Sequence, residues 1–248
     1  MKSLFVLFAC LLTVQLAAQP LTPCPMPMGY TNPQLRYVNG VTIDQSGNSW
    51  VAFKSIGIGK YNGTAWTFYD SISASLPTNQ INDIIRSSNN QIIAATANGI
   101  SIFDGSSWQH FNTINSSLPA SGVRSITENA GSLYAGTDSG LYIYNGSVWI
   151  NYNTTSGLVH NSVTAVRVAT NGDLWIATQN GLSKLSQGIF TSYDSGNTSV
   201  SNLNIISLQL NLKNEPWIIN SINQLYYLDS STGDFVSFSS LITIPPSL

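Results

Sequence analysis

One pattern recurs every 41 to 43 residues along this chain and constrains its fold more than any other feature. The stretches "NNQIIAATANGISIF" (89–103), "AGSLYAGTDSGLYIY" (130–144) and "NGDLWIATQNGLSKL" (171–185) show it most plainly. An apolar position in this motif is occupied by Trp50, Ile93, Tyr134, Trp175 and Trp217. Apolar pairs spaced i, i+3 precede the copies, at Val38/Val41, Ile81/Ile84, Val123/Ile126, Val163/Val166 and Ile205/Leu208. Markers that keep their phase through five copies indicate one structural unit repeated five times.

Each copy reads as four short strands. Runs rich in Val, Ile, Tyr and Trp are interrupted by turn signals such as "QSGN", "TNGD", "ANG" and "QNG", and Asn-Gly tolerates the positive φ angles of tight hairpins. No window of a dozen residues has the 3.6-residue apolar period of a helix. The pattern predicts an all-β fold, a β-propeller of about five four-stranded antiparallel blades. The predicted blades cover about 38–80, 81–122, 123–162, 163–204 and 205–248.

The repeated apolar residues, including all six tryptophans, are expected to pack blade against blade, because one blade cannot bury both of its faces alone. We expect the five blades to close into a ring. A longer array, of which this chain is one part, is the alternative.

The repeat also resembles a known family. "GDLWIATQNGLSKLSQGIFTSYD" (172–194) is similar to the two-component regulator propeller repeat, which reads G-x-L-W-[IV]-[GA]-T-x-x-G-L followed by F-x-x-Y. The copies at 132–152 and 91–111 match more loosely, and the resemblance extends over 38–240. It implies a propeller of the kind found in the periplasmic sensing part of bacterial hybrid histidine kinases, many of which answer to polysaccharide fragments. This sequence shows five repeats rather than seven and no kinase segment, so only the fold and a ligand-facing role carry over.

The N-terminus has the layout of a secretory signal peptide. Lys2 precedes an apolar run from Leu4 to Val14, and Ala17-Ala18 ends it. The run is about half of the roughly 20 residues that a spanning helix needs, so we expect cleavage after Ala18 rather than a membrane anchor. The predicted segments are a signal peptide over 1–18, a Pro-rich lead-in over 19–37 and the propeller over 38–248, which places the protein in the periplasm or outside the cell. Cys24 would then be the only cysteine left, without a disulfide partner.

Composition excludes several functions. The chain has nine Lys and Arg residues and eleven Asp and Glu residues. This balance leaves no basic stripe for binding nucleic acid. The sequence contains no calcium loop, P-loop or dinucleotide fingerprint, and a zinc site of cysteine type is excluded. No cofactor or metal is expected.

The predicted ligand site lies on the longer loops. In an up-and-down blade, the hairpin between the second and third strands and the connection to the next blade open on the same face, and binding residues concentrate on longer loops held by a rigid scaffold. Lys54, Asn98 and Thr164 belong to this region. The residues predicted to bind ligand are Asn82, Asp83, Arg124, Asp138, His160 and Gln179. This mixture suits a neutral glycan or a peptide better than a polyanion, and it predicts a non-catalytic binding or sensing module.

Two alternatives remain open. A glycoside hydrolase needs two carboxylates roughly 5–10 Å apart, and Asp83, Glu128 and Asp44 are the residues available at the inner strands. Asp104 and Asp173 are interpreted as turn residues. His110 and His160 have no partner at a recognisable spacing, and His110 is expected at the surface. The second alternative is a structural or assembly role with a protein partner.

Overall fold

The computed structural model describes residues 37–119 and 122–238. The predicted signal peptide, both cysteines and all but the last residue of the Pro-rich lead-in lie outside these residues. The chain divides into two compact units, Met1–Ile126 and Thr127–Leu248, and each is described separately below.

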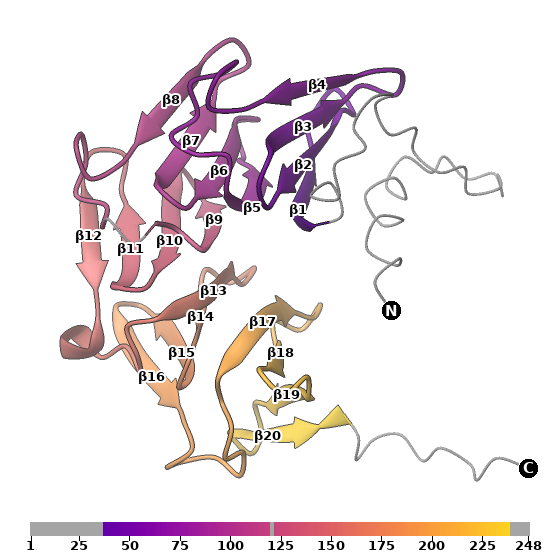
Figure 1. The fold of residues 1–248 in the computed structure, drawn as a ribbon. Helices are drawn as coiled ribbons and strands as arrows, with labels where there is room; N and C mark the ends of the chain where they lie inside the picture. Colours follow the sequence, from indigo (N-terminus) through magenta and orange to yellow (C-terminus); the bar gives the residue numbers. More distant parts are fainter. Residues whose placement is uncertain (1–36, 120–121, 239–248) are drawn as a thin grey trace, which may run out of the picture. The chain divides into compact units, whose positions relative to one another are not determined.

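The first unit contains two complete four-stranded antiparallel sheets, which we name blades 1 and 2 (Figure 1). The strands of each blade follow one another in sequence and lie side by side in the same order. Blade 1 consists of β1 (Val38–Ile43), β2 (Ser49–Phe53), β3 (Gly57–Tyr61) and β4 (Trp66–Tyr69). Blade 2 consists of β5 (Ile81–Arg86), β6 (Ile92–Thr96), β7 (Gly99–Phe103) and β8 (Trp108–Phe111).

The second unit contains blades 4 and 5 and most of blade 3. Blade 3 consists of β9 (Ser125–Asn129), which includes the boundary between the units, β10 (Ser132–Thr137), β11 (Gly140–Tyr144) and β12 (Trp149–Tyr152). Blade 4 consists of β13 (Val163–Val168), β14 (Leu174–Thr178), β15 (Gly181–Ser186) and β16 (Ile189–Tyr193). Blade 5 consists of β17 (Ile205–Leu210), β18 (Pro216–Asn220), β19 (Leu225–Asp229) and β20 (Asp234–Ser237).

The predicted all-β fold is confirmed. The described residues form five sheets of four antiparallel strands and no α-helix; a single 3₁₀ turn, η3 (Thr154–Ser156), lies between blades 3 and 4. Hairpin glycines such as Gly63, Gly105 and Gly146 have φ between 94° and 108°, the left-handed region that the Asn-Gly and Asp-Gly signals predicted. No helix in the described part of the chain is long and apolar enough to span a membrane.

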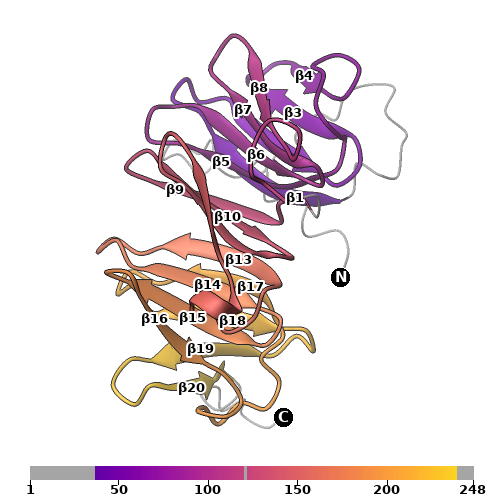
Figure 2. The same ribbon diagram turned by 90° about the vertical axis from the view of Figure 1, so that its left-hand side faces the viewer.

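The repeated apolar residues pack between successive blades. In the first unit, Trp50 of blade 1 shares a buried cluster with Ile81, Ile84 and Ile92 of blade 2. In the second unit, Figure 2 shows blades 4 and 5 next to each other, and Trp175 of blade 4 is buried with residues of blade 5 such as Leu208 and Phe235. Fully burying one such aliphatic side chain contributes about 1.5–3 kcal/mol.

The tryptophans follow the expectation in part. Trp50, Trp149 and Trp175 are buried, with exposed fractions of 1%, 9% and 6%. Trp66, Trp108 and Trp217 are half-buried.

The two ends of each blade differ in their backbone bonding. The hairpin between the second and third strands bonds to the connection that arrives from the preceding blade: Gln179 N–H donates to the carbonyl of Ser162, and Ser221 N–H to that of Asn204. We call this the connection end, and the opposite end, with the first and third hairpins, the turn end. The predicted pairing of second hairpins with blade connections is therefore present in the structure.

Candidate functional site

Asn82 and Asp83 lie at an irregularity of the innermost strand of blade 2. The register of β5 against β6 shifts between Ile81 and Asp83, and such a bulge re-aims the side chains beside it. Asn82 Nδ2 donates to the carbonyl of Val123 over 2.7 Å. Asp83 Oδ2 accepts from the hydroxyl of Ser125 and from the N–H of Ile126, both over 3.1 Å. Both side chains therefore link blade 2 to the start of the next blade.

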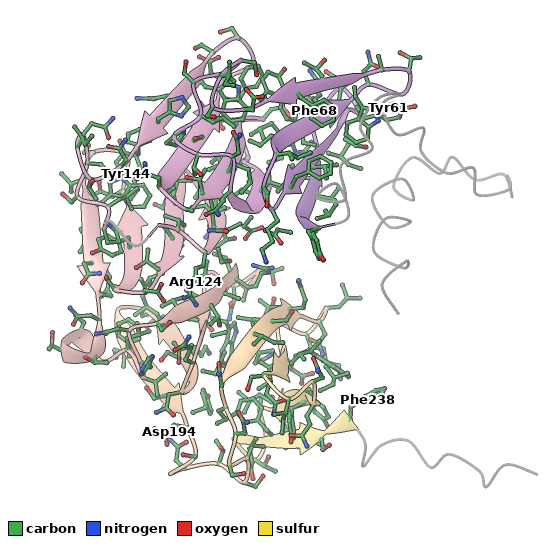
Figure 3. The ribbon with its side chains drawn as sticks, in the orientation of Figure 1. Tyr61, Phe68, Arg124, Tyr144, Asp194 and Phe238 are labelled. Atoms are coloured by element: carbon green, nitrogen blue, oxygen red, sulfur yellow. The ribbon has the colours of Figure 1, made fainter. Side chains whose placement is uncertain are left out.

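Arg124 lies between these contacts in the chain, immediately before β9 (Figure 3). Its side chain is half-buried and takes part in interactions with other groups. Of the other connection-end residues that the sequence indicated, Lys54 and Asn98 are exposed in the second hairpins of blades 1 and 2, and the Lys54 ammonium lies 5.9 Å from the centre of the Tyr37 ring.

Three predicted residues meet at the connection end of blade 4. The buried Ser162 donates its hydroxyl to Oδ1 of Asp138 over 2.8 Å. Its N–H donates to Nδ1 of His160 over 3.1 Å, and its carbonyl accepts from the N–H of Gln179. The structure thus brings together Asp138, His160 and Gln179 around a serine that sequence reasoning missed. No spacing rule marks Ser162, because Asp138 comes from the preceding blade.

The Ser162 cluster is not arranged for nucleophilic catalysis. In a catalytic triad the serine hydroxyl donates to the imidazole, whereas Ser162 donates its hydroxyl to Asp138. A backbone N–H is always a donor, so Nδ1 of His160 is the acceptor in its bond with Ser162. This nitrogen is therefore engaged by the backbone of Ser162 and does not accept from the Ser162 hydroxyl.

His110 has a partner, contrary to the sequence-based expectation. The hydroxyl of Ser101 lies 2.9 Å from Nδ1 of His110. The two residues are directly opposite on β7 and β8, a cross-strand relationship that the linear spacing does not reveal. His110 is half-buried rather than at the surface, and desolvation lowers the pKa of its imidazole. Ser101 has no exposed surface, so a substrate cannot reach its hydroxyl.

The carboxylates weighed for glycoside hydrolysis have structural partners. Partial burial of Asp44 opposes ionisation, but hydrogen bonds from Trp50, Asn48 and Ser46 outweigh it and lower the pKa of this carboxyl. Glu128 Oε1 accepts from the N–H of Gly131 over 2.7 Å. A general acid in a glycosidase needs a raised pKa, which Asp44 does not have.

Asp173 is more than a turn residue. Lys184 Nζ lies 2.7 Å from its Oδ2, and the bond from Lys184, followed by one from Ser186, lowers the pKa of the Asp173 carboxyl. Asp104 keeps the predicted turn role: its Oδ1 accepts from the N–H groups of Ser106 and Ser107, each over 2.8 Å. Across the described residues, His, Cys, Asp and Glu form no group of three that could hold a metal ion.

Blade 5 departs from the repeat at its connection end. In blades 2 to 4 a buried threonine starts the second hairpin and a glycine ends it: Thr178 donates its hydroxyl to the carbonyl of Gly181 over 2.8 Å. A Cβ on Gly181 would lie 2.5 Å from the carbonyl oxygen of Tyr193, the last residue of the outermost strand. In blade 5 the hairpin is one residue longer, with Asn220 and Gln224 in these two places. The exposed side chain of Gln224 accepts hydrogen bonds from Asn220 Nδ2 over 3.0 Å and from the Tyr226 hydroxyl over 2.9 Å.

A groove of about 560 Å³ opens beside this irregular hairpin. It is lined by residues 199–202 of the incoming connection, Ile222, Gln224, Tyr226 and residues 235–237 of β20, and we call it the blade-5 groove. Its polar groups are hydroxyls and amides, and none of the described residues that line it is charged. Tyr226 replaces the small Ser183 of blade 4, since these residues pair with Ile218 and Ile176 at the same register position.

The blade-5 groove has the size and composition of a ligand site. Pockets for small ligands measure roughly 300–1,000 Å³ and combine an apolar or aromatic lining with a few polar groups. None of the six predicted binding residues lines it. The signal that could have found it is the substitution of Gln224 for the hairpin glycine, together with the extra residue.

Five sheets built from one repeat define the chain as a β-propeller repeat protein. Residues 157–180 match the model of the two-component regulator propeller repeat. This finding confirms the resemblance stated from the sequence. A comparison with curated proteins finds no match in sequence.

Several solved propellers are similar in structure. The extracellular domain of the hybrid two component system BT3049 from B. thetaiotaomicron is 23% identical with a TM-score of 0.69, over 86% of this chain and 30% of that one. A catalytically inactive virginiamycin B lyase from Staphylococcus aureus, with quinupristin, is 16% identical with a TM-score of 0.68, over 84% and 71%. PorZ, a surface component of the type-IX secretion system of Porphyromonas gingivalis, is 19% identical with a TM-score of 0.61, over 79% and 32%.

These similarities define the fold. The chain has a propeller fold similar to the extracellular domain of a hybrid two-component system. It spans 30% of the length of the first protein and 32% of PorZ. One of the similar propellers is an enzyme, the lyase.

Proposed function

We propose that this protein is an exported, non-catalytic binding or sensing module, and that a neutral glycan or peptide binds at the connection end of its blades. The observation that carries the proposal is the blade-5 groove, where an otherwise regular repeat opens beside an aromatic side chain and several hydroxyls and amides. Real proteins break local sequence rules chiefly at functional sites.

The chemistry of the groove supports a neutral ligand. Gln224 and Asn202 each carry both donors and acceptors, and Tyr226 adds a phenol and an aromatic face. Sugar hydroxyls and peptide groups also donate and accept, so they match these side chains, whereas an anion or a cation finds no opposite charge there. The Ser162 cluster adds polar groups at the connection end of the neighbouring blade 4.

A binding screen tests this proposal. The mature chain is screened on an array of neutral glycans and on a library of extended peptides, and hits are measured by calorimetry. We expect Tyr226→Ala and Gln224→Gly to weaken binding about tenfold or more, as the loss of a stacking and hydrogen-bonding side chain would. Asp138→Ala and Gln179→Ala report on the predicted residues of the Ser162 cluster.

Each result has a defined meaning. Loss of binding in the groove variants alone assigns the site to blade 5, and loss in Asp138→Ala or Gln179→Ala extends it to the Ser162 cluster. Absence of any hit, or hits that all four variants bind like the wild type, would overturn the proposal. Release of reducing ends or of other products from a bound compound would overturn the non-catalytic part and favour the enzyme alternative.

Export is the second part of the proposal. It rests on the Lys2, Leu4–Val14 and Ala17-Ala18 layout of the sequence, and similar propellers are extracellular domains or surface components. Mass spectrometry of the protein from its native cells is expected to find Gln19, or its cyclised form, at the N-terminus. Intact Met1 on the cellular protein would contradict export through this segment.

A further inference from the structure

A second cleft, independent of the proposed function, lies between blades 4 and 5 at the turn end. Its volume is about 280 Å³, and the residues used below are Asp173, Trp175, Lys184, Lys213, Glu215 and Leu228. They come from the first hairpins of both blades and from β14, β15 and β19.

Blade 5 has smaller side chains than blade 2 at two positions that pack against the preceding blade. Between blades 1 and 2, the ring of Trp50 lies 5.4 Å from Phe103 and 6.4 Å from Trp108, centre to centre. Phe103 pairs with Trp108 across the two outer strands of blade 2. The corresponding pair in blade 5 is Leu228 and Phe235. Next to Trp175, the counterpart of Trp50, blade 5 therefore has a leucine in place of Phe103 and a phenylalanine in place of Trp108.

The inner wall of this cleft is apolar. Leu228 and Trp175, which are 2% and 6% exposed, line it. A volume of 280 Å³ is just below the usual range for drug-sized ligands, so the space fits a small molecule with a compact apolar part.

The mouth of the cleft carries both signs of charge. Lys184 Nζ lies 2.7 Å from Asp173 Oδ2 and 5.5 Å from the centre of the Trp175 ring. An ammonium has three donors, so this contact with Asp173 leaves Lys184 further hydrogens to donate. Lys213 is exposed at the same mouth. Glu215 supplies a negative charge at the same mouth. Its Oε2 accepts from Asn211 Nδ2 over 2.7 Å, and its Oε1 is a second acceptor for a ligand.

We propose that this cleft binds a small zwitterion with an apolar side chain, a free apolar L-amino acid. The ligand carboxylate is held by the ammonium groups of Lys184 and Lys213, and the ligand ammonium by Glu215. The apolar side chain enters the space beside Leu228 and Trp175. Lys184 and Lys213 give the mouth two positive charges, and Asp173 and Glu215 give it two negative charges. The mouth is therefore neutral overall. This favours a ligand that carries one charge of each sign.

Calorimetric titration of the full mature chain tests the charge requirement. The probes are L-leucine, 4-methylpentanoate, which lacks the ammonium, and 3-methylbutylamine, which lacks the carboxylate. We expect L-leucine to bind and each analogue to bind at least tenfold more weakly, because each leaves a charged group of the mouth unpaired. If 4-methylpentanoate bound as tightly as L-leucine, the requirement for a zwitterion would be wrong. If titration with L-leucine gave no heat of binding, the proposed site would be wrong.

Matched variants locate the binding. Lys213→Ala and Glu215→Gln change exposed or half-buried side chains and are expected to weaken L-leucine binding about tenfold. Leu228→Phe restores the residue that blade 2 has and is expected to abolish binding by filling the cleft. Ile72→Ala, at a side chain of the first unit that is 90% exposed, is the control and is expected to leave L-leucine binding unchanged.

The variants also separate failure of the fold from failure of the site. If Leu228→Phe lowers the thermal midpoint, Lys213→Ala, at an exposed side chain, decides the question alone. Wild-type affinity in both Lys213→Ala and Glu215→Gln, or loss of binding in Ile72→Ala, would overturn this placement.

Discussion

The indole Nε1 of Trp50 donates to Oδ2 of Asp44 over 2.9 Å. Trp50 is a core residue of blade 1, and Asp44 belongs to the first hairpin of the same blade, where its Oδ1 also accepts from the N–H groups of Ser46 and Asn48. One carboxylate thus organises the turn and satisfies the indole of the buried ring. Asp44 therefore has a structural role that explains its presence without catalysis.

Replacing Asp44 by Ala is expected to destabilise the protein by about 1–3 kcal/mol, because the buried indole loses its acceptor. Urea denaturation followed by tryptophan fluorescence measures this change.

The effect of Asp44→Ala on stability should depend on pH. The pKa of Asp44 is lowered in the folded protein, so its contribution is complete above the unfolded value near 3.8 and is lost as pH falls through the folded value. The gap between wild type and Asp44→Ala should therefore narrow in acid; a constant gap from pH 7 to pH 2 would contradict this.

Asp83→Ala is expected to cost about 1–3 kcal/mol of stability, because it leaves the Ile126 N–H and the Ser125 hydroxyl without this acceptor. Chemical denaturation of the variant measures the loss. Asp138→Ala, at an exposed carboxylate with a Ser162 contact, is the matched control and should cost less. Equal stability of Asp83→Ala and wild type would show that the bonds to blade 3 contribute nothing. Any loss of ligand binding in Asp83→Ala has to be compared with this loss of stability.

His110 is expected to make stability sensitive to pH near neutrality. Desolvation lowers the pKa of its imidazole below 6.5 in the folded state. Between the folded and unfolded values, the unfolded chain binds more protons, so stability falls as pH decreases through this window. The free energy of unfolding of His110→Gln, measured from pH 7.5 to pH 5, should fall less steeply than that of the wild type. Identical slopes would show that His110 is not the group responsible.

Trp175→Ala is expected to destabilise the protein by about 3–5 kcal/mol, the range for truncating a large aromatic side chain in a core. The residue is 6% exposed and contacts Tyr193 at 6.0 Å between ring centres. The exposed Ile189 (70%) provides the control, since Ile189→Ala removes little buried surface. A loss below about 1 kcal/mol for Trp175→Ala would mean that packing between blades 4 and 5 does not depend on this ring.

Local signals made the regular part of the fold predictable. The apolar runs and the hairpin glycines depend on neighbours within a few residues, so strands such as β14 and β15 could be located from the sequence. The candidate site was harder. Asp138, His160 and Gln179 were named as residues of one rim, but Ser162, which joins them, was not, because its partners come from two different blades.

The blade-5 groove shows the same limit. Gln224 and Tyr226 are visible in the sequence as departures from the repeat. The sequence does not say whether the space beside this hairpin is filled by other side chains or left open as a groove. That depends on how the outermost strand and the incoming connection pack around a longer hairpin. Closure of the blades into a ring stays a prediction.

The sequence by itself determined the all-β class, the five-fold repeat and the four strands of each blade, because these follow from a motif repeated every 41 to 43 residues and from local turn chemistry. Only the tertiary structure decided the partners of the polar residues: Ser101 for His110, Ser125 and Ile126 for Asp83, and Lys184 for Asp173. Hydrogen bonds and cavities arise between side chains that pairing of strands and stacking of blades bring together. Nothing in the linear order of the residues records those distances.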